Sequence, residues 1–166
     1  MLRAMLTYID GTFVEDELAT VNVRSRALNY GLGCFGGIRG YRSDDGKQVF
    51  VFRLDAHIER LEESTKILYM QLPGTQAEVC DIVLDLLRRN DVHEDIYVRP
   101  LVINNSNLLA PVLREEDSSF ICYCMPLKRY IDKDAIDVCV SSWRRVRDNA
   151  IPSRTKPTGG YLNSAL

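Results

Sequence analysis

The sequence predicts an α+β fold in which strands and hairpins surround two helices. Two segments carry apolar residues on one side only, as amphipathic helices do. The other apolar runs have the length of strands and are bounded by turn-forming residues. A further strand-like run begins after residue 134. We therefore expect a small α+β domain at 1–128, a linker at 129–134 and the start of a second domain at 135–166.

The N-terminal region predicts a β-hairpin. Leu6 to Ile9 and Thr12 to Val14 flank Asp10-Gly11, a pair typical of tight two-residue turns. Val21 to Val23 is expected to form another short extended piece.

Five glycines crowd the β-prone stretch from Arg24 to Tyr41. Gly31-x-Gly33-x-x-Gly36 has the spacing of a dinucleotide fingerprint. We exclude such a site, because no predicted strand precedes it and the following residues do not open a helix. The glycines instead indicate tight bends or backbone packed closely against another group. A turn at 44–47 then leads to a strand at 48–52.

Two helices are expected after this turn. Asp55 is expected to cap the first, which runs to about Tyr69. Arg60 lies off its apolar stripe, where a solvated ion pair with a neighbouring glutamate, Glu59 or Glu63, is the simplest role. Thr75-x-x-Glu78 has capping-box spacing and opens the second helix.

Two strands follow, at 95–104 and 119–127. Tyr97 and Arg99 share one face of the first of them. Arg99 is either a charge on an edge strand or a clamp for a carboxylate, for which its geometry is suited.

Composition excludes several classes of function. A net charge of −2 gives no electrostatic case for nucleic acid or for an acidic membrane surface. No apolar run is long enough to span a bilayer, and the N-terminus lacks the apolar core of a secretion signal. The five cysteines have no Cys-x-x-Cys spacing and no nearby histidine. We therefore expect no metal site, and reduced thiols in a cytoplasmic protein.

The last stretch, from Ser141 to Leu166, is the richest in chemical groups. A predicted strand at 136–142 leads into a proline-marked loop that holds Lys156, then Gly159-Gly160 and the first turn of a helix. A lysine beside other cations can lose its proton and attack a carbonyl carbon. The glycines and a helix N-terminus would favour an anion such as phosphate. From the residues alone, a solvated surface lysine is the commoner case.

Several stretches, taken together and in order, resemble one family. They are Ala27 to Gly31, Cys34 to Arg39, Phe52 to Leu61, Tyr97 to Leu101, and the terminal run from Ser141 through Lys156 to Leu162. The chain resembles the fold-type IV pyridoxal-phosphate-dependent aminotransferases, and within them the branched-chain amino acid aminotransferase group.

The resemblance implies a role for each matching residue. Lys156 matches the lysine that forms a Schiff base with pyridoxal 5'-phosphate and acts as the general base. Tyr161 matches the tyrosine that hydrogen-bonds the cofactor ring oxygen, and Arg60 the arginine that holds its phosphate. Tyr97 would contact the α-carboxylate of the substrate, and Arg99 the side-chain carboxylate of glutamate. The full set of matched substrate-pocket residues is Tyr30, Phe35, Gly37, Tyr97, Arg99 and, in the interdomain segment, Tyr130.

The implied reaction is transamination of branched-chain L-amino acids with 2-oxoglutarate by a ping-pong mechanism. The implied partners are amino acid and 2-oxo acid substrates and a second copy of the chain, in a homodimer or higher homo-oligomer. D-amino acid transaminase and aminodeoxychorismate lyase are alternatives within the same fold. A domain that folds and dimerises without holding a cofactor is an alternative from another class.

The chain departs from the family pattern in three ways. Gly36 replaces the usual glutamate, which removes a carboxylate near the pocket entrance, and Gly160 replaces the usual asparagine. Family members also continue into a second half. We therefore expect a fragment that holds the small domain and only the first strand and helix start of the large one, and that is inactive alone.

Overall fold

The computed structural model describes residues 5–131 and 133–166, and its described strands form one sheet. The strand order is β2-β1-β7-β6-β4-β5, and β3 pairs with β6. All the pairings are antiparallel. The strands are β1 (Leu6–Ile9), β2 (Thr12–Glu15), β3 (Gly33–Phe35), β4 (Ile38–Arg42), β5 (Val49–Val51), β6 (Ile96–Asn104) and β7 (Ser118–Pro126). The α-helices are α1 (Arg26–Tyr30), α2 (Leu54–Ile67), α3 (Gln76–Arg89) and α4 (Tyr161–Ala165), and the 3-10 turns are η1 (Asp16–Leu18), η2 (Glu115–Asp117) and η3 (Thr158–Gly160).

The predicted N-terminal hairpin is confirmed. Asp10 and Gly11 both have positive φ, 43° and 94°, as its tight turn requires. The Asp10 carboxylate also accepts a hydrogen bond from the backbone N–H of Phe120 at 2.7 Å, which ties the turn to β7. The extended piece expected at 21–23 is wrong: these residues form no strand, and Val23 is exposed. They lead instead into α1, which is capped by the side chain of Ser25.

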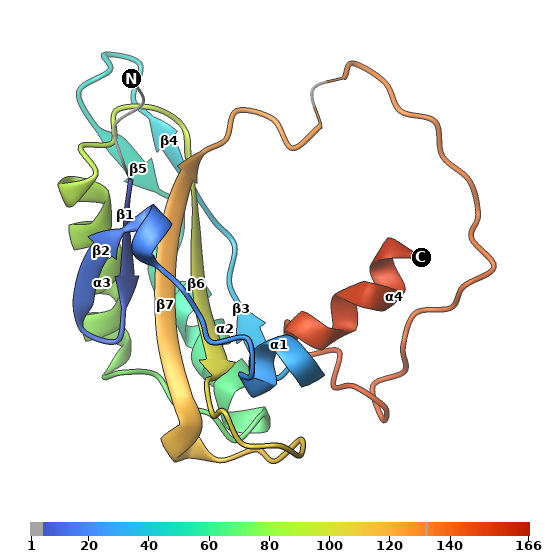
Figure 1. Cartoon of the computed structure of the whole chain (residues 1–166). Coiled ribbons are helices and arrows are strands. Elements are labelled where there is room, and N and C mark those ends of the chain that lie inside the picture. The colour runs from blue at the N-terminus through green and yellow to red at the C-terminus, as the bar shows by residue number, and fades with distance from the viewer. Residues whose placement is uncertain (1–4, 132) are drawn as a thin grey trace.

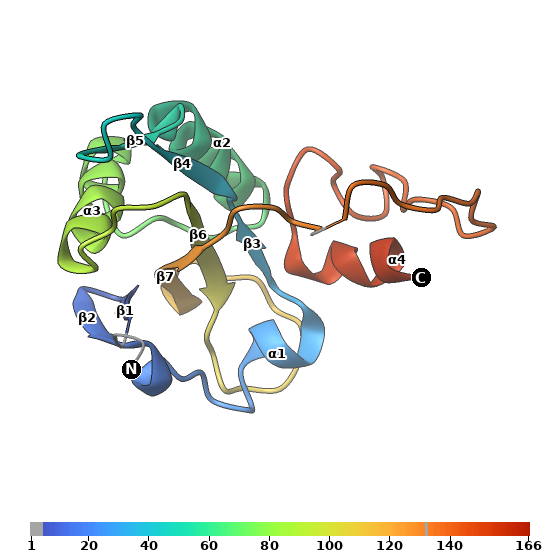
Figure 2. The same ribbon diagram turned by 90° about the horizontal axis from the view of Figure 1, so that it is seen from above.

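The helices α2 and α3 lie side by side and cover one face of the sheet (Figures 1 and 2). The capping box of Thr75 and Glu78 is confirmed at the start of α3. The cap expected from Asp55 is wrong, because α2 starts at Leu54 and the residue before it is Arg53, in a left-handed conformation. Asp55 lies in the first turn, where its charge complements the helix dipole. Fully buried apolar side chains from both layers form the core, among them Ile58, Val79, Val83, Leu86, Ile38, Ile96, Val98 and Val102.

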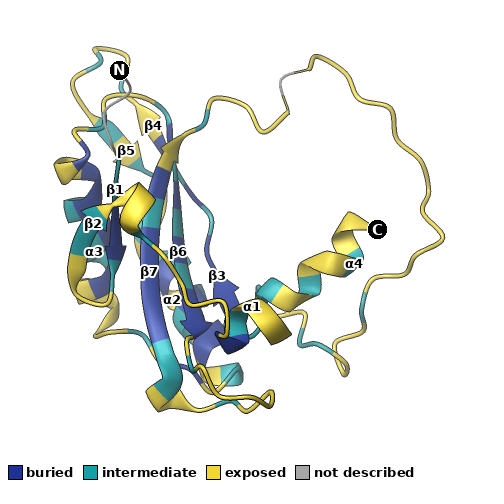
Figure 3. Cartoon of the chain, in the orientation of Figure 1, coloured by how far each residue is buried: buried dark blue, intermediate teal, exposed yellow. Residues whose placement is uncertain are grey.

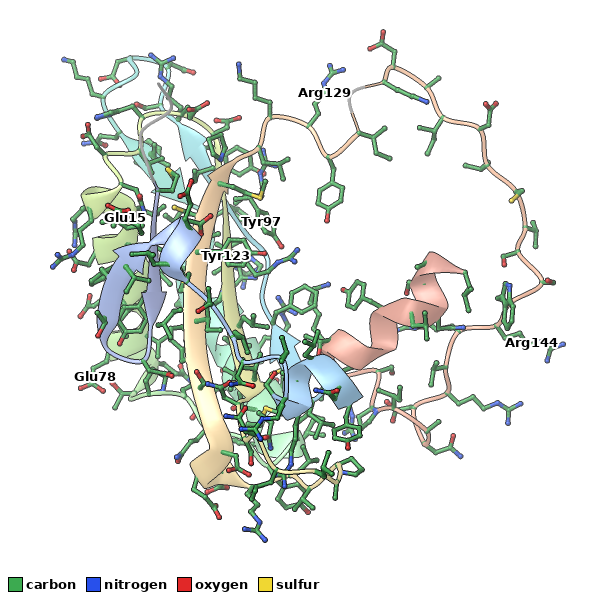
Figure 4. All side chains as sticks on the ribbon, viewed as in Figure 1. Glu15, Glu78, Tyr97, Tyr123, Arg129 and Arg144 are labelled. Atoms are coloured by element: carbon green, nitrogen blue, oxygen red, sulfur yellow. The ribbon has the colours of Figure 1, made fainter. Side chains whose placement is uncertain are left out.

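The strand β6 separates the core from a second surface, on the opposite face of the sheet. Ile96 and Val98 are buried under the helices, whereas Tyr97 and Arg99 point to the opposite face, as the two-residue period predicts. Figure 4 shows Tyr97, with Tyr123 of β7, on the side that faces the C-terminal segment. This face carries the candidate site.

The segment after β7 makes a wide arc and returns to the sheet near β3 and α1 (Figures 1 and 3). The strand expected at 136–142 is wrong, since these residues form neither helix nor strand. Val138 and Val140 are 83% and 100% exposed. A strand needs a neighbour for its backbone N–H and C=O groups, and none of the described strands lies beside this run. The helix expected near the end is confirmed as η3 followed by α4.

Two further properties concern the described part of the chain. None of its helices is long and apolar enough to cross a membrane. Its residues include no cluster of three or more His, Cys, Asp or Glu side chains placed to hold a metal ion. The linker expected at 129–134 includes residue 132, which lies outside the described residues.

Candidate active site

Lys156 lies in a loop that is hydrogen-bonded to the sheet. We call residues 152–158 the Lys156 loop. The backbone N–H of Phe35 donates to the carbonyl oxygen of Lys156 at 3.1 Å, and Pro157 forms an isolated β-bridge with Cys34. The Lys156 amine donates a hydrogen bond to the hydroxyl of Tyr161, the first residue of α4. The structure thus brings together the amine and the phenol that the sequence singled out.

A cavity of about 490 Å³ opens beside this pair. Arg60 lines it from α2, so a residue almost 100 positions earlier in the sequence joins Lys156 and Tyr161 around one cavity. Arg145 and Arg154 also line the cavity. The cavity therefore combines one amine, one phenol and three guanidinium groups, a composition that suits a small anionic ligand.

Arg60 is held by a histidine, and the structure does not pair it with Glu59 or Glu63. Its Nη2 atom lies 3.2 Å from Nδ1 of His57, one turn earlier on α2. Burial, followed by the positive charges of Arg60 and Arg53, lowers the pKa of His57. The imidazole is thus neutral at pH 7, and Nδ1 accepts the hydrogen bond from Arg60.

A second group of side chains continues from Lys156 along the face of the sheet. The Lys156 amine lies 5.0 Å from the ring centroid of Phe35, and the Arg99 guanidinium lies 4.6 Å from the same ring on β3. Arg99 donates from Nε and Nη2 to the hydroxyl of Tyr97, at 3.1 and 2.9 Å. The aromatic ring of Phe35 thus connects a lysine at one end to an arginine at the other.

Arg99 is held as a cation. Partial burial lowers its pKa, but the hydrogen bonds to Tyr97 and the nearby phenols of Tyr123, Tyr97 and Tyr130 outweigh this effect and raise the pKa above its ordinary value. A permanent positive charge on an otherwise aromatic surface favours a carboxylate.

The other predicted pocket residues differ in position. Gly37 packs against Tyr97, and a Cβ atom there would lie 2.7 Å from the Tyr97 hydroxyl oxygen, so only glycine leaves room for this arrangement. Tyr30 lines an adjoining cavity of about 330 Å³, which shares Pro157 and Gly160 with the first, and its hydroxyl accepts a hydrogen bond from the N–H of Ala110 at 3.3 Å. Tyr130 is 79% exposed, and of the three tyrosines it contributes least to the raised pKa of Arg99.

Sequence reasoning gave no role to two residues at this site. Tyr123 lies across from Arg99 in the register of β6 with β7, with its ring centroid 5.9 Å from the guanidinium. That pairing depends on strand register, which single-sequence periodicity does not reveal. His57 was detectable, because its spacing of three residues from Arg60 on a predicted helix makes the two neighbours.

The side chains around the cavity fit pyridoxal 5'-phosphate. The guanidinium groups of Arg60, Arg145 and Arg154 match a phosphate, the amine of Lys156 matches an aldehyde, and the hydroxyl of Tyr161 matches the ring oxygen beside that aldehyde. An anionic ligand also needs few buried carboxylates nearby, and no Asp or Glu lines the cavity among the residues that the structure describes.

Comparisons with known proteins agree with this composition. Residues 33–166 match the model of the family described as Amino-transferase class IV. The probable branched-chain-amino-acid aminotransferase of Aquifex aeolicus is 34% identical over 160 residues, which cover 96% of this chain and 51% of that protein. The branched-chain-amino-acid aminotransferase of Escherichia coli K12 is 33% identical, over 99% of this chain and 54% of its own length.

Solved structures share the fold. The branched-chain aminotransferase of Thermoproteus uzoniensis with norvaline superposes with a TM-score of 0.89 at 36% identity, over 98% of this chain and 54% of that one. The branched-chain amino acid aminotransferase of Thermobaculum terrenum in its PLP-form gives a TM-score of 0.81 at 28% identity, over 98% and 53%. The chain belongs to the class IV amino-transferase family. It spans about half the length of the curated relatives it matches.

Proposed function

We propose that this chain carries the lysine-bearing half of the active site of a pyridoxal-phosphate-dependent aminotransferase. The proposed reaction transfers the amino group of branched-chain L-amino acids to 2-oxoglutarate. The observation that supports it best is the hydrogen bond from Lys156 to Tyr161 above a cavity that also contains Arg60. The names of the relatives, branched-chain aminotransferases at 33–34% identity, point to the same chemistry.

The residues of the cavity divide the work. Bound pyridoxal phosphate supplies an electron sink that makes the α-proton of an attached amino acid acidic. Arg60, fixed by His57, holds the phosphate, which sets the position of the ring relative to Lys156. The Lys156 amine would take the proton from the substrate α-carbon and return it to the cofactor's former aldehyde carbon, on the other side of the amino nitrogen, and the Tyr161 hydroxyl holds that amine in reach.

The second cluster sets the choice of substrate. The Phe35 ring offers apolar contact to a branched side chain, and the Arg99 guanidinium beside it offers a partner to the side-chain carboxylate of glutamate or 2-oxoglutarate. Tyr97, whose hydroxyl accepts hydrogen bonds from Arg99, is assigned to bind the α-carboxylate of the substrate. Tyr30 and Tyr130 belong to this pocket in the proposal although they lie apart from Lys156 here.

The proposal extends to the domain organisation, the oligomeric state and the location of the protein. Residues 1–128 are the small domain, 129–134 the linker and 135–166 part of the large domain, in accord with a sheet whose strands all lie between Leu6 and Pro126. We further propose a homodimer and a cytoplasmic location, the latter in keeping with five free cysteines.

An amino-donor panel on the protein, with pyridoxal phosphate and 2-oxoglutarate, tests the proposal. We expect leucine, isoleucine and valine to be converted to their oxo acids. Turnover of D-alanine without turnover of these three would replace the assignment with D-amino acid transamination. Release of an aromatic product and pyruvate from aminodeoxychorismate would replace it with the lyase. If the protein does not retain the cofactor at all, the assignment would be replaced by that of a non-catalytic domain.

A further inference from the structure

The Lys156 loop is joined to the start of β3 by contacts that span more than 120 positions of the sequence. The Thr158 hydroxyl donates to the carbonyl oxygen of Gly31 at 2.7 Å, and the carbonyl oxygen of Gly33 lies 3.2 Å from the same hydroxyl. The backbone N–H of Gly159 also donates to the Gly31 carbonyl, at 3.2 Å. Two donors from one side thus converge on one backbone oxygen.

The fit at this junction depends on Gly31. Its φ of +66° ends α1 in a left-handed conformation, which aims the carbonyl at the incoming loop. A Cβ atom at Gly31 would lie 2.7 Å from the Cα atom of Gly159, so two backbones meet here with no side chain between them.

The opposite end of the junction lies at Lys156 itself. The N–H of Phe35 donates to the Lys156 carbonyl oxygen, and Cys34 bridges Pro157. The backbone on both sides of the lysine is therefore fixed to β3 and to the end of α1. Since Phe35 also contacts Tyr161 through its ring, at 5.1 Å between centroids, the same anchor supports both partners of the amine–phenol pair.

We propose that Thr158 is a positioning residue, whose hydroxyl anchors the Lys156 loop on the Gly31 and Gly33 carbonyls and so sets where the Lys156 amine stands relative to Tyr161 and Arg60. The role assigned to the amine rests on the proposed function, whereas the anchor itself does not. Threonine suits this place because its hydroxyl reaches the carbonyls and its branched Cβ restricts the rotamer.

The substitution Thr158→Val tests the anchor, since it keeps the shape and removes the donor. Thr158→Ser restores the donor. Thr65→Val is the matched control, because the Thr65 hydroxyl also donates to a backbone carbonyl, that of Glu62, but within α2. Two measurements are made on each variant of the whole protein.

The first measurement is hydrogen exchange at the amides of Phe35 and Gly159, without cofactor. The second is the rate at which pyridoxal phosphate and borohydride label Lys156, divided by the rate at the exposed Lys47. For Thr158→Val we expect the exchange rate at both amides to rise about tenfold and the labelling ratio to fall about tenfold. A factor of about ten corresponds to the free energy of one or two hydrogen bonds. Thr158→Ser should recover most of both, and Thr65→Val should change neither.

Unchanged exchange and labelling in Thr158→Val would overturn the inference. So would an equal rise of exchange throughout the sheet, because the hydroxyl would then serve general stability only. A wild-type protein in which Lys156 reacts no faster than Lys47 would contradict the proposed function, while the exchange data would still decide for or against the anchor.

Discussion

Replacing Gly31 with alanine is expected to displace the Lys156 loop from the sheet. The added Cβ atom would lie 2.7 Å from the Cα atom of Gly159, whereas carbon atoms in contact are about 3.5–4.0 Å apart. Gly159 must therefore retreat by about 1 Å. The hydrogen bond from its N–H to Gly31, now 3.2 Å, would then exceed the length at which such a bond forms.

The magnitude has two parts. Alanine at φ +66° costs about 1–2 kcal/mol, because its Cβ crowds the following carbonyl oxygen. Loss of the bonds that Gly159 and Thr158 donate to Gly31 adds about 1 kcal/mol each. We expect a total loss of about 3–4 kcal/mol in the free energy of unfolding.

Denaturant unfolding with a constant m-value measures this loss, and Gly11→Ala is the control. Gly11 also has positive φ, +94°, but its Cβ would have no heavy atom within 4 Å, so it carries the conformational part alone. The Gly31 variant should be about 2 kcal/mol less stable than the Gly11 variant. Equal stabilities of the two variants, with unchanged labelling of Lys156, would refute the contact as the cause.

Three further predictions concern other parts of the molecule. Arg26 is 3% exposed and donates to the carbonyls of Leu108 and Val112 and to the Asp117 carboxylate at 2.8 Å. Arg26→Met should therefore lower the free energy of unfolding, measured in urea titrations, by about 2–4 kcal/mol. The control Arg114→Ala removes only an exposed ion pair with Glu116 and should change this free energy by less than about 0.5 kcal/mol. Burial raises the pKa of Cys34 and of Cys124 from 9.0 to about 12, so the unfolded chain loses these protons first and stability should fall as the pH rises from about 9 toward 12. Cys34→Ala should make the plot of unfolding free energy against pH less steep. An identical slope in this variant would contradict the assignment. His57→Asn keeps a hydrogen-bond acceptor close to the position of Nδ1 and should retain most of the affinity for inorganic phosphate, measured by calorimetric titration. His57→Leu should weaken this affinity about tenfold. The difference between the two His57 variants should vanish when Arg60 is also replaced by alanine.

Local patterns predicted the parts of the fold that local forces determine. The Thr75–Glu78 capping box, the Asp10-Gly11 turn and the shared face of Tyr97 and Arg99 depend on spacing within a few residues, and the structure has all three. The same reasoning failed at 21–23 and at 136–142, because apolar alternation shows that a strand could form but not whether a partner strand is present. The short helix α1 also went unpredicted, since bonds from Arg26 to residues more than 80 positions away support it.

The candidate site divides in the same way. Lys156 and Tyr161 are five residues apart, at a loop and the start of a helix, so their meeting follows from local geometry. The approach of Arg60 to that pair depends on how α2 packs on the sheet, and only family resemblance anticipated it. Tyr30 and Tyr130 were also matched to the family pattern, Tyr130 in surroundings that differ from it, and both lie outside the cavity of Lys156.

The most direct test of the central claim is to locate the lysine that pyridoxal phosphate modifies. After borohydride reduction, peptide mapping should find the adduct on Lys156 in large excess over Lys47, Lys66, Lys128 and Lys133, and either Arg60→Ala or added inorganic phosphate should reduce that excess. An adduct spread evenly over the five lysines, unaffected by Arg60→Ala, would contradict the account.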